Sequence, residues 1–287
     1  MGSIVLAACT SHSPGITGFP ERADPAAAGH VLGGFAELAT GAAASDLDAI
    51  VAVSSEHFTN LFLSNFPAFS VGSAREYPLP ASDAFSRFLR IPRIQYPGHE
   101  RLGEVLYEGL LRRDFDPSLM AGAYGFDEGF SVPLTLLDTG AQVPVVPIVV
   151  NSVHPPYPSL RRCHALGTAL AEIISDQHVA ERVMVLGTGG LSHWVGLPGA
   201  GQIDPDFDRR VLDAFEQGRA DELLDLTDED IDRSGNGAHE IRSWLVVAGA
   251  TGASPYRTLA YEAVPAWLTG TSIVRADLDT ADPEGVR

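Results

Sequence analysis

The chain has 287 residues, 45% of them apolar, a formal net charge of −18, and no lysine. That length suits one large domain or two small ones, with an ample core, and the acidity argues against a nucleic-acid partner, which needs a basic face. No apolar run reaches the length of a membrane span, and the short uncharged N-terminus is not typical of a signal peptide. The two lone cysteines, Cys9 and Cys163, give no disulfide framework, so we expect a cytoplasmic protein.

Short apolar runs alternate with amphipathic stretches along the chain. The apolar runs predict buried strands at 3–9, 48–55, 143–151 and 182–188, and a further strand at 256–264. The amphipathic stretches predict helices near 26–40, 98–113, 159–175 and 206–217. This alternation predicts a single α/β domain over residues 1–275, with a central, largely parallel or mixed sheet flanked by helices. The polar residues 276–287 are expected to form a flexible tail.

Residues 73–98 differ from the rest of the chain because they are rich in proline and aromatic residues and have no clean period. Such a segment is either a lid over a site or an ordinary surface excursion. The sequence leaves both interpretations open.

Histidines follow four of the predicted strands. They are His12, His57, His154 and His193. Ligands of open α/β sheets bind beyond the carboxyl ends of the strands, so these four positions predict a functional site. A single histidine of this kind is usually structural, but four at corresponding places are harder to attribute to chance.

Two histidines and one carboxylate form the ligand set of mononuclear non-haem Fe(II) sites, and some zinc hydrolases use the same set. His12 and His57 are the most natural pair, and they need a carboxylate from elsewhere. Glu56 would point away from its neighbour His57 if the strand continues. Glu240 opens an apolar helix after the glycine-rich turn "SGNG", where backbone can approach a site closely.

Other common chemistries have no matching motif. The stretch "GTGGLSH" (187–193) is not the GxGxxG pattern of dinucleotide sites, and no P-loop pattern is present. The GxSxG elbow of serine hydrolases is also missing from the sequence. A nucleotide cofactor and a serine nucleophile are therefore disfavoured.

Six segments in a shared order carry a resemblance to a known family. They are "SHSPG" (11–15), "SSEHFTNLFLSNFPAFSVG" (54–72), "FDEGFSVPL" (126–134), "VVPIVVNSV" (145–153), "GTGGLSH" (187–193) and "GNGAHEIRSWL" (235–245). Over residues 3 to 270 the chain resembles the class III extradiol ring-cleaving dioxygenases, and it looks closest to the 2,3-dihydroxyphenylpropionate 1,2-dioxygenase branch. The resemblance implies a single α/β domain, Fe(II) as cofactor, a small aromatic diol and O2 as substrates, and a homo-oligomer.

The resemblance also implies roles for particular residues. His12, His57 and Glu240 match the iron ligands of the family, and His193 matches its acid/base histidine. Ser13, Phe58 and Gly190 lie next to these positions in the sequence and are expected near the aromatic ring. His239 is expected to form a pocket-edge or structural hydrogen bond, with substrate contact as the alternative.

One position departs from the family pattern. The family usually has Asp-His-Gly where this chain has Asp127-Glu128-Gly129. Glu128 is expected to be protonated and to donate the proton that the histidine would give, or to pair with an amino group of a substrate such as an aminophenol, or to turn outward and only shape the pocket. The departure also keeps open a metalloenzyme of this fold with non-oxidative chemistry. A metal-free binding protein is the remaining alternative.

Overall fold

The computed structural model describes residues 1–122, 124–137 and 139–278. Within them, a mixed sheet has the strand order β6-β3-β7-β2-β8-β1-β10-β9. Its strands are β1 (Ser3–Thr10), β2 (Ala49–Ser54), β3 (Phe69–Gly72), β6 (Ser118–Met120), β7 (Val145–Val150), β8 (Arg182–Thr188), β9 (Tyr256–Val264) and β10 (Thr269–Ala276). The central strands β7, β2, β8 and β1 are mutually parallel, and antiparallel pairings join β3 to β7 and β10 to both β1 and β9. The predicted α/β fold with a largely parallel or mixed sheet is confirmed.

The central strands divide the core into two layers. Side chains alternate between the faces of a strand, so Ile50 and Ala52 of β2 point to one layer and Val51 and Val53 to the other. All four are fully buried because helices cover both faces of the sheet. This burial on both faces explains why the strand sequences are continuous apolar runs.

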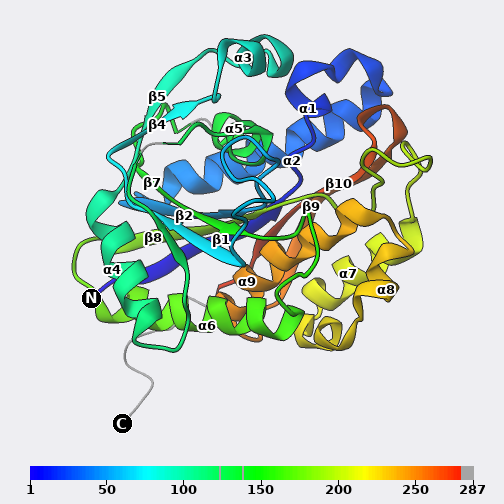
Figure 1. Cartoon of the computed structure of the whole chain (residues 1–287). Coiled ribbons are helices and arrows are strands. Elements are labelled where there is room, and N and C mark those ends of the chain that lie inside the picture. Colours follow the sequence, from blue (N-terminus) through cyan, green and yellow to red (C-terminus); the bar gives the residue numbers. More distant parts are fainter. Residues whose placement is uncertain (123, 138, 279–287) are drawn as a thin grey trace.

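Different helices cover the two faces (Figure 1). Helices α2 (Pro25–Ala44) and α5 (Glu128–Leu136) lie above the sheet as drawn, and α4 (Glu100–Leu111), α6 (Leu160–Asp176) and α9 (Ile241–Thr251) lie below it. The remaining helical segments are α1 (Gly15–Gly18), α3 (Asp83–Leu89), α7 (Pro205–Glu216), α8 (Asp228–Asp232), and the 3-10 turns Pro20–Arg22, Ala220–Asp225, Asn236–Glu240 and Pro265–Trp267. None of the described helices has the length and apolarity needed to cross a membrane.

The segment 73–98 is an ordered excursion. It forms a two-stranded hairpin of β4 (Glu76–Leu79) and β5 (Ile94–Pro97), with α3 between the strands. Tyr77, Leu79 and Tyr96 are buried in the core layer beneath α2 and α5. No residue of the segment lines the cavity around His12 and His57 that is described below, so this structure favours the excursion over the lid.

Strand β10 was not predicted from the sequence. It lies inside the sheet between β1 and β9, and Ala276, the first residue of the expected tail, is its last residue. Residues 279–287 of that tail lie outside the described part of the chain.

Candidate active site

The carboxyl ends of three neighbouring strands meet at one edge of the sheet. His12 follows β1, His57 follows β2, and the turn that leads to His193 follows β8. Strand β8 lies between β1 and β2, so the two histidines approach each other across its end, with ring centroids 5.1 Å apart.

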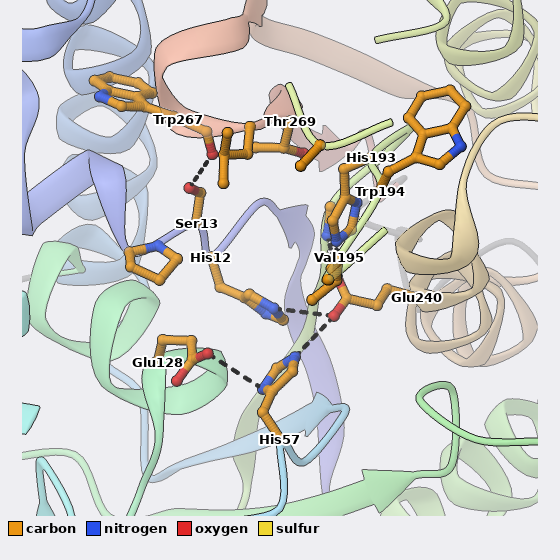
Figure 2. A pocket seen from close by; sticks show the side chains of 15 residues that line it. His12, Ser13, His57, Glu128, His193, Trp194, Val195, Glu240, Trp267 and Thr269 are labelled. Atoms are coloured by element: carbon orange, nitrogen blue, oxygen red, sulfur yellow. Dashed lines mark hydrogen bonds and ion pairs between the residues drawn. The ribbon is translucent and has the colours of Figure 1, made fainter. Parts of the chain in front are cut away.

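Glu240 completes a cluster of three side chains that can bind a metal (Figure 2). Its Oε1 lies 3.2 Å from His12 Nε2 and 2.9 Å from His57 Nε2. The three ligand atoms lie within 4.8 Å of one another. Two imidazole nitrogens and one carboxylate oxygen that converge in this way form a donor set suited to a divalent transition metal.

The outer nitrogens of both histidines are held in place. His12 Nδ1 lies 3.1 Å from the Thr188 hydroxyl, and His57 Nδ1 lies 3.0 Å from Asp127 Oδ2. When each Nδ1–H donates to its oxygen partner, each Nε2 faces Glu240: a protonated Nε2 donates to that carboxylate, and a deprotonated Nε2 presents a lone pair to a metal ion. Hydrogen bonding of this kind sets the tautomer and orientation of metal-binding histidines.

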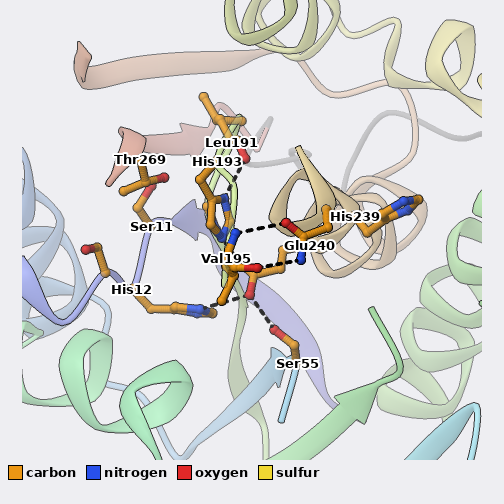
Figure 3. A network of polar contacts seen from close by, with 12 residues as sticks. Ser11, His12, Ser55, Leu191, His193, Val195, His239, Glu240 and Thr269 are labelled. Carbon is orange, nitrogen blue, oxygen red and sulfur yellow. Dashed lines mark hydrogen bonds and ion pairs between the residues drawn. The ribbon is translucent and has the colours of Figure 1, made fainter. Parts of the chain in front are cut away.

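Glu240 is held by groups that closely follow strands β2 and β8. Its Oε1 accepts from the Ser55 hydroxyl at 2.9 Å, and its Oε2 accepts from the Gly190 backbone N–H at 2.6 Å (Figure 3). Burial would raise the pKa of this carboxyl, but His12, His57 and His193 lower it well below its usual value. A buried carboxylate that stays ionised suits a cation at this position.

The pKa of His57 reflects the several carboxyl groups that surround it. Burial alone would lower its pKa, but Glu128, Asp127 and Glu240 outweigh burial and raise the pKa well above the usual value. Asp127 and Glu128 form a second acidic group around His57. Because Asp127 already accepts from His57 Nδ1 and from the backbone N–H groups of His57 and Gly129, it is better suited to orient that histidine than to bind a second metal.

His193 faces the cluster from the opposite side. Its Nδ1 donates to the Leu191 carbonyl at 3.0 Å, which leaves Nε2 as an acceptor 3.7 Å from Glu240 Oε2 (Figure 3). Burial lowers its pKa, although Glu240 opposes that effect. A neutral imidazole with a free Nε2 lone pair can act as a base at neutral pH.

Two glycines allow the Glu240 turn to approach His193. A Cβ on Gly237 would lie 2.0 Å from His193 Nε2, and a Cβ on Gly235, whose φ is +103°, would lie 2.0 Å from the His193 carbonyl oxygen. The glycine-rich turn expected from the sequence thus brings Glu240 close to the strand ends.

Glu128 begins α5, next to the N-cap residue Asp127. Its Oε1 lies 3.8 Å from His57 Nδ1, and its buried Oε2 has no hydrogen-bond partner among the described residues. Burial is the largest cause of its raised pKa; His57 opposes the rise and Asp127 adds to it. The side chain is only 17% exposed and lines the cavity, which disfavours the interpretation that it turns outward.

These groups lie at one end of a cavity of about 220 Å³. Its lining residues are His12, Ser13, Pro14, His57, Glu128, Gly190, His193, Trp194, Val195, Gly196, Ala200, Glu240, Trp267, Leu268 and Thr269. Of the residues expected near an aromatic ring, Ser13 and Gly190 line this cavity.

Phe58 and His239 lie outside that lining. Phe58 is 42% exposed and borders a second groove that shares only His57 with the cavity lining. His239 is fully buried, with Nε2 2.9 Å from Asp232 Oδ1 and its ring stacked on Tyr157 at 4.1 Å. These contacts agree with a structural hydrogen bond for His239 and give no support to substrate contact.

His154 is the one strand-end histidine that does not join the cluster. It is exposed, and its backbone N–H and carbonyl oxygen are bound by the Asn151 side chain. Sequence reasoning also missed several residues of the site. Asp127 and Thr188 stood inside quoted motifs, whereas Trp267, Leu268 and Thr269 lie at the turn into the unpredicted strand β10.

Comparison with known proteins agrees with this geometry. The family described as "Catalytic LigB subunit of aromatic ring-opening dioxygenase" matches residues 6–272. The chain belongs to this LigB family. The expected resemblance to extradiol ring-cleaving dioxygenases is thereby confirmed.

Named relatives of this LigB-family chain are distant in sequence but similar in length. A protein of Cupriavidus necator named 2,3-dihydroxyphenylpropionate/2,3-dihydroxicinnamic acid 1,2-dioxygenase is 27% identical, covering 94% of this chain and 97% of its own. A protein of the same name from Paraburkholderia xenovorans is 28% identical, covering 95% and 97%. A crystal structure of an uncharacterised Escherichia coli K12 protein shares the fold, with a TM-score of 0.59 and 19% identity over 84% of this chain and 91% of the other.

Proposed function

We propose that this chain is a non-haem Fe(II)-dependent extradiol dioxygenase that cleaves the ring of a catechol-type substrate with O2. The observation that carries the proposal is the convergence of His12, His57 and Glu240 beneath His193 in one cavity. Membership of a family of ring-opening dioxygenases supports the same reaction class.

The residues present fit a bound Fe(II). Two neutral imidazoles and one carboxylate would hold it and leave positions open for ligands, which is the facial arrangement of non-haem iron oxygenases. Bound Fe(II) would supply the redox chemistry that allows an aromatic diol to react with O2. Thr188 and Asp127 would keep the two histidines in the tautomer that presents Nε2.

His193 is proposed to take a proton from a hydroxyl of the diol at Nε2. Its Nδ1–H remains bonded to the Leu191 carbonyl during this step, so the ring keeps its orientation. Its lowered pKa keeps the imidazole neutral, and therefore basic, at neutral pH.

Glu128 is proposed to supply a proton to the opening ring. Its raised pKa and its place in the cavity support a protonated carboxyl that can donate. Its unpartnered Oε2 would equally accept from an amino group, and this observation supports an aminophenol as a second candidate substrate. Glu128→His is expected to change turnover or the preference between a catechol and an aminophenol. Unchanged turnover and preference would exclude both roles.

The test of the reaction is anaerobic reconstitution with Fe(II), followed by a panel of catechols. We expect uptake of O2 together with a yellow ring-opened product. Iron binding without O2 uptake by any catechol would favour a non-oxidative metalloenzyme of this fold. Failure to retain iron after loading would favour a metal-free binding protein.

The domain, the compartment and the assembly are parts of the same proposal. One catalytic domain over residues 1–275 is supported by the sheet, in which β1 from the start of the chain pairs with β10 from its end. A cytoplasmic location is supported by Cys9 and Cys163, both buried and free. A homo-oligomer is proposed on the family resemblance alone, and light scattering of the purified protein would test it.

A further inference from the structure

The cavity has two ends of different chemistry. The polar end consists of His12, His57, Glu128, His193 and Glu240. The apolar wall consists of Pro14, Trp194, Val195, Ala200, Trp267 and Leu268. A diol bound at the polar end would direct its ring substituent toward this wall, and Figure 2 draws Trp267 at the end of the cavity away from His57 and Glu128.

Three polar groups beside the wall already donate their hydrogen atoms to backbone carbonyl oxygens. The Trp267 indole N–H donates to the Phe19 carbonyl at 3.1 Å, and the Ser13 hydroxyl donates to the Trp267 carbonyl at 2.7 Å. The Thr269 hydroxyl donates to the Gly270 carbonyl at 3.0 Å. None of these groups has a proton left to donate to an anionic substituent.

The other polar side chains of the cavity lie at its polar end: the carboxyl groups of Glu240 and Glu128, and the imidazoles of His12, His57 and His193, of which His193 presents the lone pair of Nε2. No arginine lines the cavity in the described part of the chain, and the sequence contains no lysine. A carboxylate placed against the apolar wall would lose its hydration without gaining an arginine or lysine as counter-charge, and this is strongly unfavourable.

We propose that the substrate of this cavity carries an uncharged, apolar ring substituent, and that carboxylate-bearing catechols are rejected. The proposal rests on the proposed ring-cleaving function and names its substrate class. It separates this chain from the relatives described above, whose names specify propionate and cinnamic acid substrates.

A matched pair of catechols tests the proposal, namely 2,3-dihydroxyphenylpropionate and its methyl ester. Binding to the Fe(II)-loaded protein is measured without oxygen, by calorimetry and by the fluorescence of Trp194 and Trp267, and turnover is measured separately as O2 uptake. We expect the ester to bind at least about tenfold more tightly and to have a higher kcat/KM.

The outcomes separate the two proposals. Equal or tighter binding of the acid overturns the substrate class, and the ring-cleaving function stands if the acid is then cleaved. Tighter binding of the ester without O2 uptake supports the substrate class and overturns the function. Absence of binding by either compound overturns both.

Two variants on one loop test the missing counter-charge. Val195 is 57% exposed and lines the cavity, whereas Leu197 is 47% exposed and lies outside the lining. Val195→Arg is expected to tighten binding of the acid roughly three- to tenfold relative to the ester, more strongly at low salt. Leu197→Arg adds the same net charge and should leave the ratio unchanged. An equal gain in both variants, or in neither, contradicts a counter-charge that acts locally in the cavity.

Discussion

The polar end and the apolar wall of the cavity are built in different ways. At the polar end, His12 and Glu240 are 4% and 2% exposed, and each is held by hydrogen bonds from the ends of central strands. At the apolar wall, Val195 and Leu268 are 57% and 50% exposed and belong to connecting segments. The sheet thus holds the groups that must keep their geometry, while the residues proposed to set the substrate class lie on loops that tolerate change.

The largest expected effect comes from removing the carboxylate ligand at the polar end. Glu240→Gln should lower bound iron and O2 uptake by more than about 100-fold, because the ligand set loses its only charge and outer partners alone affect metal affinity by 10–100-fold. Iron content after anaerobic loading and initial rates of O2 uptake measure the effect.

Glu56→Gln is the matched control for that variant. Glu56 is also fully buried and adjoins His57, but its carboxylate accepts from Asn60 and Leu61 and points away from the cluster. The Glu56→Gln variant should bind as much iron as the wild type. If both variants lost iron equally, the loss would result from removing any buried negative charge near His57 and not from removing a metal ligand.

A smaller effect is expected for the base. His193→Gln should lower kcat by roughly 10²–10⁴-fold while iron content stays near that of the wild type. The proposed base would act in its neutral form, so the rate should fall as pH drops through its pKa, and a lowered pKa places this decline below the usual histidine range near 6.5. The variant should lose this limb of the pH–rate profile. Loss of iron in the variant would instead assign His193 to metal binding.

A still smaller effect is expected from changing Asp127, which accepts the hydrogen bond from His57 Nδ1. Asp127→Asn is expected to weaken iron affinity by about 10–100-fold, because the acceptor that orients Nδ1–H loses its charge. Phe58→Ala, next to His57 but exposed and outside the cavity lining, is the control and should keep wild-type affinity. Metal titrations of both variants against a competing chelator measure the difference. An unchanged Asp127→Asn affinity would restrict that residue to capping α5.

The same contrast explains what the sequence could predict. The central strands are buried on both faces, and such strands leave continuous apolar runs that a sequence reveals. Strand β10 is equally central, but its Thr271 and Ser272 are buried hydroxyl residues. Ser272 is satisfied by bonds to Ser11 and to the Ala260 carbonyl, partners that only the folded sheet supplies. A polar strand of this kind resembles a loop in sequence.

The two ends of the cavity also differ in how far the sequence could predict them. Histidines after strands mark the polar end in the sequence, and their meeting follows from parallel strands ending at one edge. The apolar wall combines Pro14 with Trp194 and Trp267, and no local pattern connects residues so far apart in sequence. His154 shows the limit of the strand-end argument, because the loop after β7 turns this side chain into solvent.

The smallest expected effect on catalysis comes from a buried carboxylate outside the cavity lining. Asp208 is fully buried in α7, accepts from the Ser192 backbone N–H at 2.7 Å and from the Tyr261 hydroxyl at 2.9 Å, and so fastens the His193 turn to β9. Burial raises its pKa from 3.8 to about 6. Because the folded state holds this proton more tightly than the unfolded state, the stability that the proton contributes is present below pH 4 and is lost as pH rises to about 6.

Asp208→Asn removes this dependence while it keeps an acceptor for Ser192. The free energy of unfolding of the variant, relative to the wild type, should therefore rise by about 3 kcal/mol between pH 4 and pH 7. Urea unfolding of the metal-free proteins measures it, and Asp206→Asn, exposed on the same helix, should follow the wild type. A difference that stays flat with pH would contradict a buried, proton-binding Asp208. A loss of O2 uptake as large as that of His193→Gln would show that Asp208 takes part in the chemistry of the polar end. The groups needed for catalysis would then extend beyond the cavity lining to a carboxylate of α7.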